Sequence, residues 1–190
     1  LKRADLIRPL KKQSRRKRQI KRIYQPFVGQ LIEVDTKFLR RGEDSRYQYT
    51  FVDAASRYPV CFITKKLNLN TSCQLLREAQ RQFPFKIGII QTDNGLEFQS
   101  HFVSLCHQLG LEHRYINLRS AEQNGIVERF HRTIETEFWN TISLDKSIKY
   151  LQKQLDHYLK WFRTKRIHLG LEGLTPQDFI KKVTKNIEDY

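Results

Sequence analysis

The 190-residue sequence has no methionine and only three cysteines, Cys61, Cys73 and Cys106. An odd set of cysteines without a CxxC pair argues against a disulfide framework and a structural zinc finger, so we expect a reduced, intracellular compartment. The longest apolar stretches, such as residues 87–90, are too short to span a bilayer, and the basic start lacks an apolar signal region. We therefore expect no membrane association. Because the chain starts at Leu1 and contains no methionine, we expect a fragment or a processed chain.

Acidic residues are scarce, with 20 Asp and Glu against 35 Lys and Arg, a formal net charge of +15. Eleven of the basic residues and one acid lie within residues 1–22, which gives that segment +10 and leaves +5 for the rest. Such a segment repels itself when free and binds phosphate with release of counterions, so we predict a mobile DNA-binding arm. The alternative is a solubilising or nuclear-targeting tail. The basic residues expected to contact DNA are Lys11, Lys12, Arg15, Arg16, Lys17 and Arg18.

Hydrophobic residues make up 39% of the chain and aromatic residues 12%, which is enough for one sizeable core. Residues 31–38 alternate in polarity, so a strand there has Glu33, Asp35 and Lys37 on one face. Turn residues at 42–45 and two further apolar stretches, 47–52 and 58–64, predict an antiparallel meander.

The rest of the chain alternates between helical and strand patterns. The segment from Thr71 to Gln74 has capping-box spacing, which predicts that a helix begins near Thr71. Residues 87–90 and 112–116 read as strands, and residues 98–109 as a helix that stops at Gly110. Further helices are expected over residues 126–138 and 148–162 and after Thr175-Pro176. This order predicts an α/β fold with a mixed five-stranded sheet flanked by helices.

Three acids stand out within this pattern. Asp35 lies in the middle of the first strand, Asp93 follows the buried fourth strand, and Glu128 lies off the apolar stripe of its helix. Carboxylates brought together repel one another and need cations to stay ionised, and hard oxygen ligands favour Mg²⁺ or Mn²⁺ over zinc. The three acids are therefore predicted to form one metal site. Asp53 and Glu97 are expected to be structural rather than metal ligands.

The motifs around these acids resemble the catalytic core of the DDE transposase and retroviral integrase superfamily, most closely the insertion-sequence transposases of bacteria. The matching segments are Glu33-Val34-Asp35-Thr36-Lys37, Asp53-Ala54-Ala55-Ser56-Arg57-Tyr58, Thr92-Asp93-Asn94-Gly95-Leu96-Glu97-Phe98, Asn124-Gly125-Ile126-Val127-Glu128-Arg129 and residues 166–176. Between Asp93 and Glu128 lie 34 residues, close to the spacing usual in that family.

The resemblance implies a ribonuclease H-like fold and metal-dependent cleavage and strand transfer of DNA. It further implies two divalent ions, Mg²⁺ or Mn²⁺, with Asp35 between both and Asp93 and Glu128 each holding one. The chain then divides into a basic segment (1–25), an integrase-type catalytic core (26–165) and a C-terminal helical extension (166–190). Enzymes of this kind work as multimers on DNA ends, so we expect a homo-oligomer when the protein is active.

Other residues near the acids are candidates for DNA contact: Lys37, Gln123, Asn124, Arg129 and Arg132. Arg132 is equally able to pair with Glu128 or Glu135 on its own helix. His131 is expected to be a polar neighbour without a catalytic role. Two other functions stay open from the sequence: a DNA-binding accessory or regulatory module that has lost turnover, and a nuclease of the same fold that cuts without joining.

Overall fold

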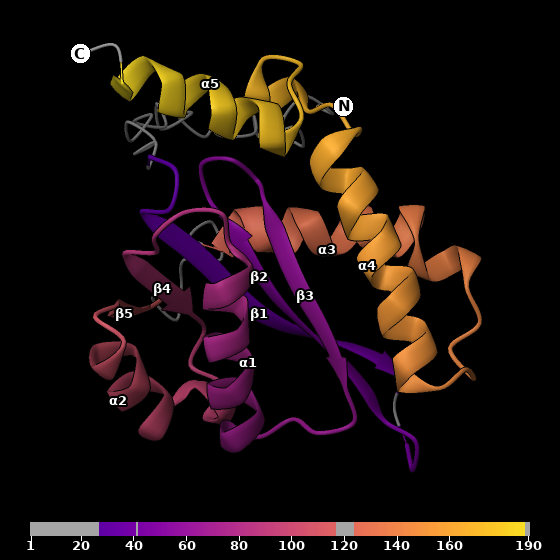
Figure 1. Ribbon diagram of the computed structural model, residues 1–190. Coiled ribbons are helices and arrows are strands. Elements are labelled where there is room, and N and C mark those ends of the chain that lie inside the picture. The colour runs from indigo at the N-terminus through magenta and orange to yellow at the C-terminus, as the bar shows by residue number, and fades with distance from the viewer. Residues whose placement is uncertain (1–26, 41, 117–123, 189–190) are drawn as a thin grey trace, which may run out of the picture.

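Five strands form one mixed sheet in the computed structural model, which describes residues 27–40, 42–116 and 124–188 (Figure 1). The strands are β1 (Leu31–Arg40), β2 (Arg46–Asp53), β3 (Pro59–Thr64), β4 (Ile89–Thr92) and β5 (Glu112–Tyr115), in the spatial order β3-β2-β1-β4-β5. The first three strands pair antiparallel, whereas β4 pairs parallel to both β1 and β5. The predicted fold class and the predicted meander are thus confirmed.

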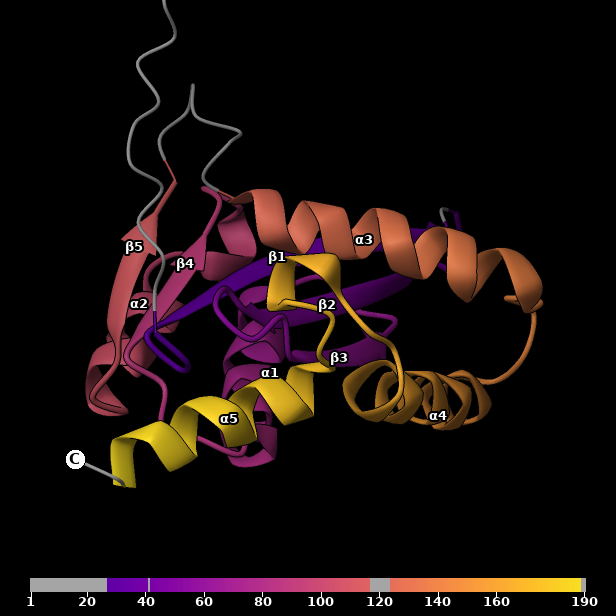
Figure 2. The same ribbon diagram turned by 90° about the horizontal axis from the view of Figure 1, so that it is seen from above.

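Helices cover both faces of this sheet (Figures 1 and 2). They are α1 (Leu69–Gln82), α2 (His101–Gln108), α3 (Gly125–Glu137), α4 (Ile148–Thr164) and α5 (Pro176–Glu188), with short 3-10 turns η1 (Leu96–Phe98), η3 (Trp139–Thr141) and η4 (Leu169–Leu171). No helix in the described parts of the chain has the length and apolar character needed to cross a bilayer.

Alternation along the strands separates two apolar cores. Ile32, Val34 and Tyr49 point to the face covered by α1 and α2, where they are fully buried. Val52 and Cys61 point to the opposite face and pack with the apolar sides of α3 and α4. Because successive strand residues face opposite sides, Glu33, Asp35 and Lys37 must lie on the α3 side. The fold therefore places the polar face of β1, with Glu33, Asp35 and Lys37, against α3.

Most predicted boundaries shift by one or two residues, and three differences stand out. The α1 helix begins at Leu69 because Asn68, not Thr71, is its N-cap, with the Asn68 side chain accepting a hydrogen bond from the Thr71 N–H. The predicted helix over 98–109 is interrupted at Ser100, whose φ of 46° is left-handed, so η1 and α2 are separate. The β4 strand lies two residues later than the apolar run at 87–90. Gly110, at φ 72°, ends α2 as predicted.

Asp53 has the structural role predicted for it. Its carboxylate is fully buried and accepts hydrogen bonds from the Gly29 N–H at 2.9 Å, the Ser56 N–H at 2.7 Å and the Ser56 hydroxyl at 2.6 Å. These bonds fasten the turn between β2 and β3 to the segment before β1. The Asp53 carboxylate therefore accepts its hydrogen bonds from groups of the fold itself, as expected for a structural residue.

Candidate active site

Asp35 lies in the middle of β1 on the face turned toward α3. Its Oδ1 accepts a 2.8 Å hydrogen bond from the Thr36 N–H, and its Oδ2 lies 3.5 Å from Nδ1 of His131 on α3. The Asp35 side chain is 23% exposed, so it is shielded but reachable from solvent. One carboxylate oxygen is thus held by the backbone, while the other faces α3.

Asp93 follows the C-terminal end of β4, the edge at which parallel strands usually carry ligands. Its Oδ1 accepts a 3.0 Å hydrogen bond from the Gly95 N–H. A Cβ added to Gly95 would lie 2.7 Å from Oε2 of Glu97 and 3.0 Å from Oδ1 of Asp93. These distances show that both carboxylates lie next to Gly95. Glu97 also accepts a 3.0 Å hydrogen bond from the Thr36 hydroxyl next to Asp35.

Glu128 lies in the first turn of α3, and the start of that helix is fixed to β1 by Glu33. One oxygen of Glu33, Oε2, accepts hydrogen bonds of 2.9 Å from the N–H groups of both Ile126 and Val127. These are N–H groups of the first helical turn, which have no partner within the helix. Glu33 is only 4% exposed, and burial, opposed by these two bonds, raises its pKa to about 7. The Glu33 side chain on β1 therefore fixes the position of the first turn of α3, in which Glu128 lies.

The charges of Asp93 and Glu128 act on Asp35. Burial, together with the negative charges of Asp93, Glu128 and Glu97, raises the pKa of Asp35 to about 7, against the hydrogen bond from the Thr36 N–H. Among residues 27–40, 42–116 and 124–188, no three His, Cys, Asp or Glu side chains already surround a point that would hold a cation.

Sequence reasoning gave no role to His131, which lies in contact with Asp35. His131 is 9% exposed, and its Nε2 lies 2.9 Å from the hydroxyl of Thr50, the residue opposite Asp35 on β2. Burial, with the nearby charge of Lys37, lowers the pKa of His131 to about 4, so the ring is neutral at pH 7. The contact with Asp35 is then one of neutral imidazole to carboxyl rather than an ion pair.

The residues predicted to contact DNA differ in accessibility. Lys37 forms a 2.7 Å ion pair with Glu135, whereas Arg129 and Arg132 are exposed on α3. Asn124 is 3% exposed, and its Oδ1 has no hydrogen-bond partner among the described residues. Gln123 and the basic residues at positions 11–18 lie outside the described residues. Their contacts with DNA stay predictions.

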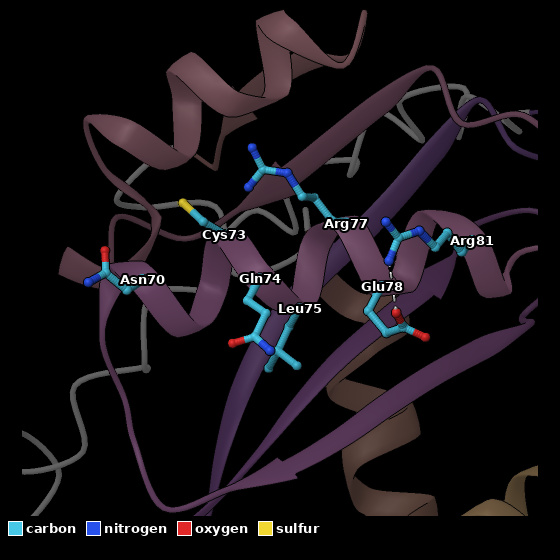
Figure 3. Close-up of a pocket in the computed structure, with 7 residues that line it drawn as sticks. All are labelled: Asn70, Cys73, Gln74, Leu75, Arg77, Glu78 and Arg81. Carbon is cyan, nitrogen blue, oxygen red and sulfur yellow. Dashed lines mark hydrogen bonds and ion pairs between the residues drawn. The ribbon is translucent and has the colours of Figure 1, made fainter.

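A surface depression of about 570 Å³ lies on the outer side of α1, on the other side of the sheet from the three predicted acids (Figure 3). All its lining residues come from that one helix: Asn70, Cys73, Gln74, Leu75, Arg77, Glu78 and Arg81. Glu78 and Arg81 pair with each other at 3.3 Å. Because a single helix forms the whole lining and none of the three predicted acids contributes to it, this depression is not the candidate site.

Two family models match the sequence, and both describe an integrase core domain. One covers residues 26–121 and the other residues 109–176. The first model alone spans just over half of the chain, and together the two contain all three predicted acids.

Two curated proteins are similar in sequence. "Putative integrase ORF3" of Spiroplasma virus SpV1-C74 is 26% identical over 181 residues, which cover 83% of this chain and 46% of that protein. The transposase for insertion sequence element IS904 of Lactococcus lactis subsp. lactis is 27% identical over 94 residues, 49% of this chain and 37% of that protein. The chain therefore spans less than half the length of either relative.

Solved structures share the fold at low sequence identity. The catalytic core domain of BIV integrase matches with a TM-score of 0.65 and 17% identity, covering 84% of this chain and 99% of that one. The HTLV-2 integrase catalytic core domain in complex with magnesium matches with a TM-score of 0.63 and 16% identity, covering 80% of this chain and 97% of that one. These likenesses establish the ribonuclease H-like fold.

Proposed function

Because this chain belongs to the integrase core domain family, we propose that it is the catalytic core of an enzyme that cuts DNA strands and joins them to new positions. Asp35, Asp93 and Glu128 are its proposed catalytic acids. One observation carries this assignment: Glu33, two residues before Asp35 on β1, anchors the first turn of α3, which bears Glu128, while β1 pairs with β4, the strand that Asp93 follows. Crowded carboxylates are costly for a fold and are typical of sites that bind cations.

Two Mg²⁺ or Mn²⁺ ions fit the proposed donor set, because the three acids offer only hard oxygen ligands. Asp35 would hold both ions, with Asp93 and Glu128 holding one each. When bound, such ions supply Lewis acidity that makes water or a 3′-hydroxyl nucleophilic and stabilises the leaving oxygen at phosphorus. No covalent bond between protein and DNA is required, so cleavage and joining use one site.

Backbone N–H groups prepare the acids for this role. The N–H of Thr36 holds Oδ1 of Asp35, and the N–H of Gly95 holds Oδ1 of Asp93. Each bond fixes one oxygen, and the second oxygen of each carboxylate accepts no backbone hydrogen bond from the residues that the structure describes. Fixed carboxylates lose less entropy when they bind an ion, which supports a preorganised site.

The partner in this proposal is DNA, bound by a chain with formal net charge +15. Phosphate contacts are assigned to Lys37, Arg129, Arg132, Gln123, Asn124 and the basic segment at residues 1–25. Active assemblies are proposed to contain several copies of the protein, so that two DNA ends are held together.

The test is cleavage and strand transfer on supercoiled plasmid in Mn²⁺, with a labelled oligonucleotide as the strand to be joined. Asp93→Asn and Glu128→Gln should lower both products by at least about 100-fold, since each removes a ligand charge. Glu78→Gln on α1 removes an equal charge across the sheet and should leave activity within about twofold of wild type.

The outcomes separate the alternatives. Nicked plasmid without joined oligonucleotide would identify a nuclease, and binding without any product, in wild type and variants alike, would identify an accessory module. Crystals soaked in Mn²⁺ give an independent test, because anomalous density should lie between Asp35, Asp93 and Glu128. Density elsewhere, or products that persist in EDTA, would contradict the proposed acids.

A further inference from the structure

The N-terminal half of α3 lies near the segment that follows α4 (Figure 2). Residues of these two segments line a cavity of about 350 Å³. Its volume falls in the range of pockets that bind small ligands, roughly 300–1,000 Å³. The lining includes arginines from three parts of the chain, Arg57, Arg129 and Arg166, together with apolar side chains. The proposed catalytic acids do not line it.

Helical geometry relates this cavity to the acids. With about 100° per residue, Arg132 lies about 40° around α3 from Glu128, Arg129 about 100° and Ile126 about 160°. Glu128 faces the β1 side, whereas Arg129 and Ile126 line the cavity on the other flank. The exposed crest between them carries Arg132 and Arg129. A strand bound at Glu128 that crosses this crest would reach the cavity.

The cavity has positive charge that the protein does not neutralise. The Arg166 guanidinium is engaged by Glu137, with contacts of 2.6 to 3.0 Å. Arg129 is exposed and has no carboxylate within ion-pair distance in the described ranges. Arg57 donates to the Ala54 carbonyl. Burial lowers its pKa, the negative charge of Glu33 and, more weakly, that of Asp53 oppose this shift, and the positive charge of Arg129 adds to it.

Glu33 and Asp53 offset part of the charge of Arg57, but neither forms an ion pair with Arg129 among the described residues. An anion between Arg57 and Arg129 would relieve their mutual repulsion. Guanidinium groups suit phosphate in particular, since their planar donors match its oxygens.

Apolar surface adjoins these charges. Ile167 is 65% exposed and Leu169 is 95% exposed at the edge of the cavity, while Phe130 and Phe162 are buried in its floor. His168 also lines the cavity, and its Nε2 is buried with no hydrogen-bond partner within the described residues. Sites for single-stranded nucleic acid combine positive charge for the phosphates with apolar, usually aromatic, side chains for the bases. Here the arginines supply the charge, and the exposed apolar side chains beside them are aliphatic.

We propose that this cavity binds one nucleotide of a DNA strand that runs from the catalytic acids across α3. Arg57 and Arg129 hold its phosphate, and Ile126, Ile167 and Leu169 contact its base or sugar. The proposal rests on DNA being the substrate, and it adds a subsite on the far flank of α3. An acidic peptide would satisfy the arginines but would leave the apolar edge uncovered, so a nucleotide is the better occupant.

The experiment is a titration of the full chain, ¹³C-labelled at Ile and Leu methyl groups, with the 5′-phosphorylated trinucleotide pTpTpT in EDTA. Methyl signals of Ile126, Ile167 and Leu169 should shift and saturate. These signals report the cavity alone, whatever the basic N-terminal segment binds. Because EDTA excludes metal-dependent catalysis, this binding is measured independently of strand cleavage. Cleavage without these shifts would overturn the subsite and leave the proposed function standing.

Two variants separate the two halves of the subsite. Arg129→Gln should weaken binding about fivefold and reduce the salt slope, log Kd against log salt, by about 0.7 for one lost phosphate contact. Leu169→Ser should weaken binding without changing that slope, because it removes apolar contact only. Arg77→Gln on α1 is the charge-matched control and should behave as wild type.

Three results would overturn the proposal: methyl signals that stay unshifted, an effect of Arg129→Gln no larger than that of Arg77→Gln, or Leu169→Ser binding as wild type does. Tetraglutamate is the competing probe. If it shifts the same methyl signals at the same concentration, the cavity binds acidic groups in general and the assignment to a nucleotide fails.

Discussion

Lys37 Nζ lies 2.7 Å from Oε2 of Glu135, and this ion pair is the last of three contacts that join one face of β1 to α3. The other two are made by Glu33 at the start of α3 and by Asp35 with His131. Every second residue of a strand advances about 6.7 Å, and four helical residues advance about 6 Å. The near match lets α3 run along β1 with a contact at each turn.

The Lys37–Glu135 pair predicts opposite effects on DNA binding. Glu135→Gln should strengthen binding about two- to fivefold and steepen its salt dependence, because it frees the ammonium group and removes a negative charge. Lys37→Gln should weaken binding by a similar factor. Fluorescence anisotropy with a labelled duplex at several salt concentrations measures both. A weaker complex for Glu135→Gln would show that Lys37 serves the helix contact rather than DNA.

Glu33 predicts a graded effect on stability. Glu33→Ala leaves the N–H groups of Ile126 and Val127 without their acceptor and should cost about 2 to 4 kcal/mol of unfolding free energy. Glu33→Gln keeps a carbonyl oxygen in place and should cost about 1 kcal/mol. Urea unfolding measures these differences. Amide exchange should accelerate at residues 126 and 127 in the alanine variant; unchanged protection there would refute the anchoring role.

His131 is predicted to be a positioning residue for Asp35. His131→Phe keeps a ring in the core but loses the bond to Thr50 and the polar contact with Asp35, which should lower kcat about 10- to 100-fold. DNA affinity and the urea midpoint should change little. The exposed His157 on α4 gives a matched control, His157→Phe, expected to retain wild-type kcat. Equal losses of kcat and stability would mean that His131 only supports the core.

Glu137 predicts a pH-dependent contribution to stability. Partial burial opposes ionisation, but the bonds from Arg166 and Tyr158 outweigh it and hold the pKa of Glu137 below its ordinary value of 4.5. A lowered pKa stabilises the fold above pH 4.5 and loses that effect as the carboxylate is protonated.

Glu137→Gln should therefore cost about 1 kcal/mol at pH 7, with a smaller difference from wild type as the pH falls below 4.5. Urea unfolding of both proteins at pH 7 and at pH 3.5 checks the direction. A difference that grows on acidification would contradict the assignment.

Local patterns in the sequence predicted the strands, the helices and the elements on which the acids lie. The alternation around Asp35 predicted β1 and its polar face, and the apolar stripe of α3 predicted the buried side that contains Val127, Phe130 and Ile134. Such signals arise from neighbouring residues in one element. Boundaries failed where a single side chain or dihedral angle decided them, as at Asn68 and Ser100.

The contacts that organise the site could not be predicted in this way. Glu33 and the N–H of Val127 are 94 residues apart, and no local pattern encodes that pairing. The alternation of polar and apolar residues in β1 did place Glu33 on the same face as Asp35. This was the one sequence signal that Glu33 lies near the site. His131 reads as one polar residue on a helix until the register of α3 on β1 is known.

The anchoring of α3 by Glu33 has a consequence for the nascent chain. The meander of β1 to β3 pairs among near neighbours in sequence, but Glu128 arrives beside Asp35 only after synthesis has passed β4, β5 and the first turn of α3. Under the proposed function, an unfinished polypeptide that lacks α3 lacks one of its three catalytic acids. The proposed reaction with DNA then requires α3 to be synthesised and anchored on β1.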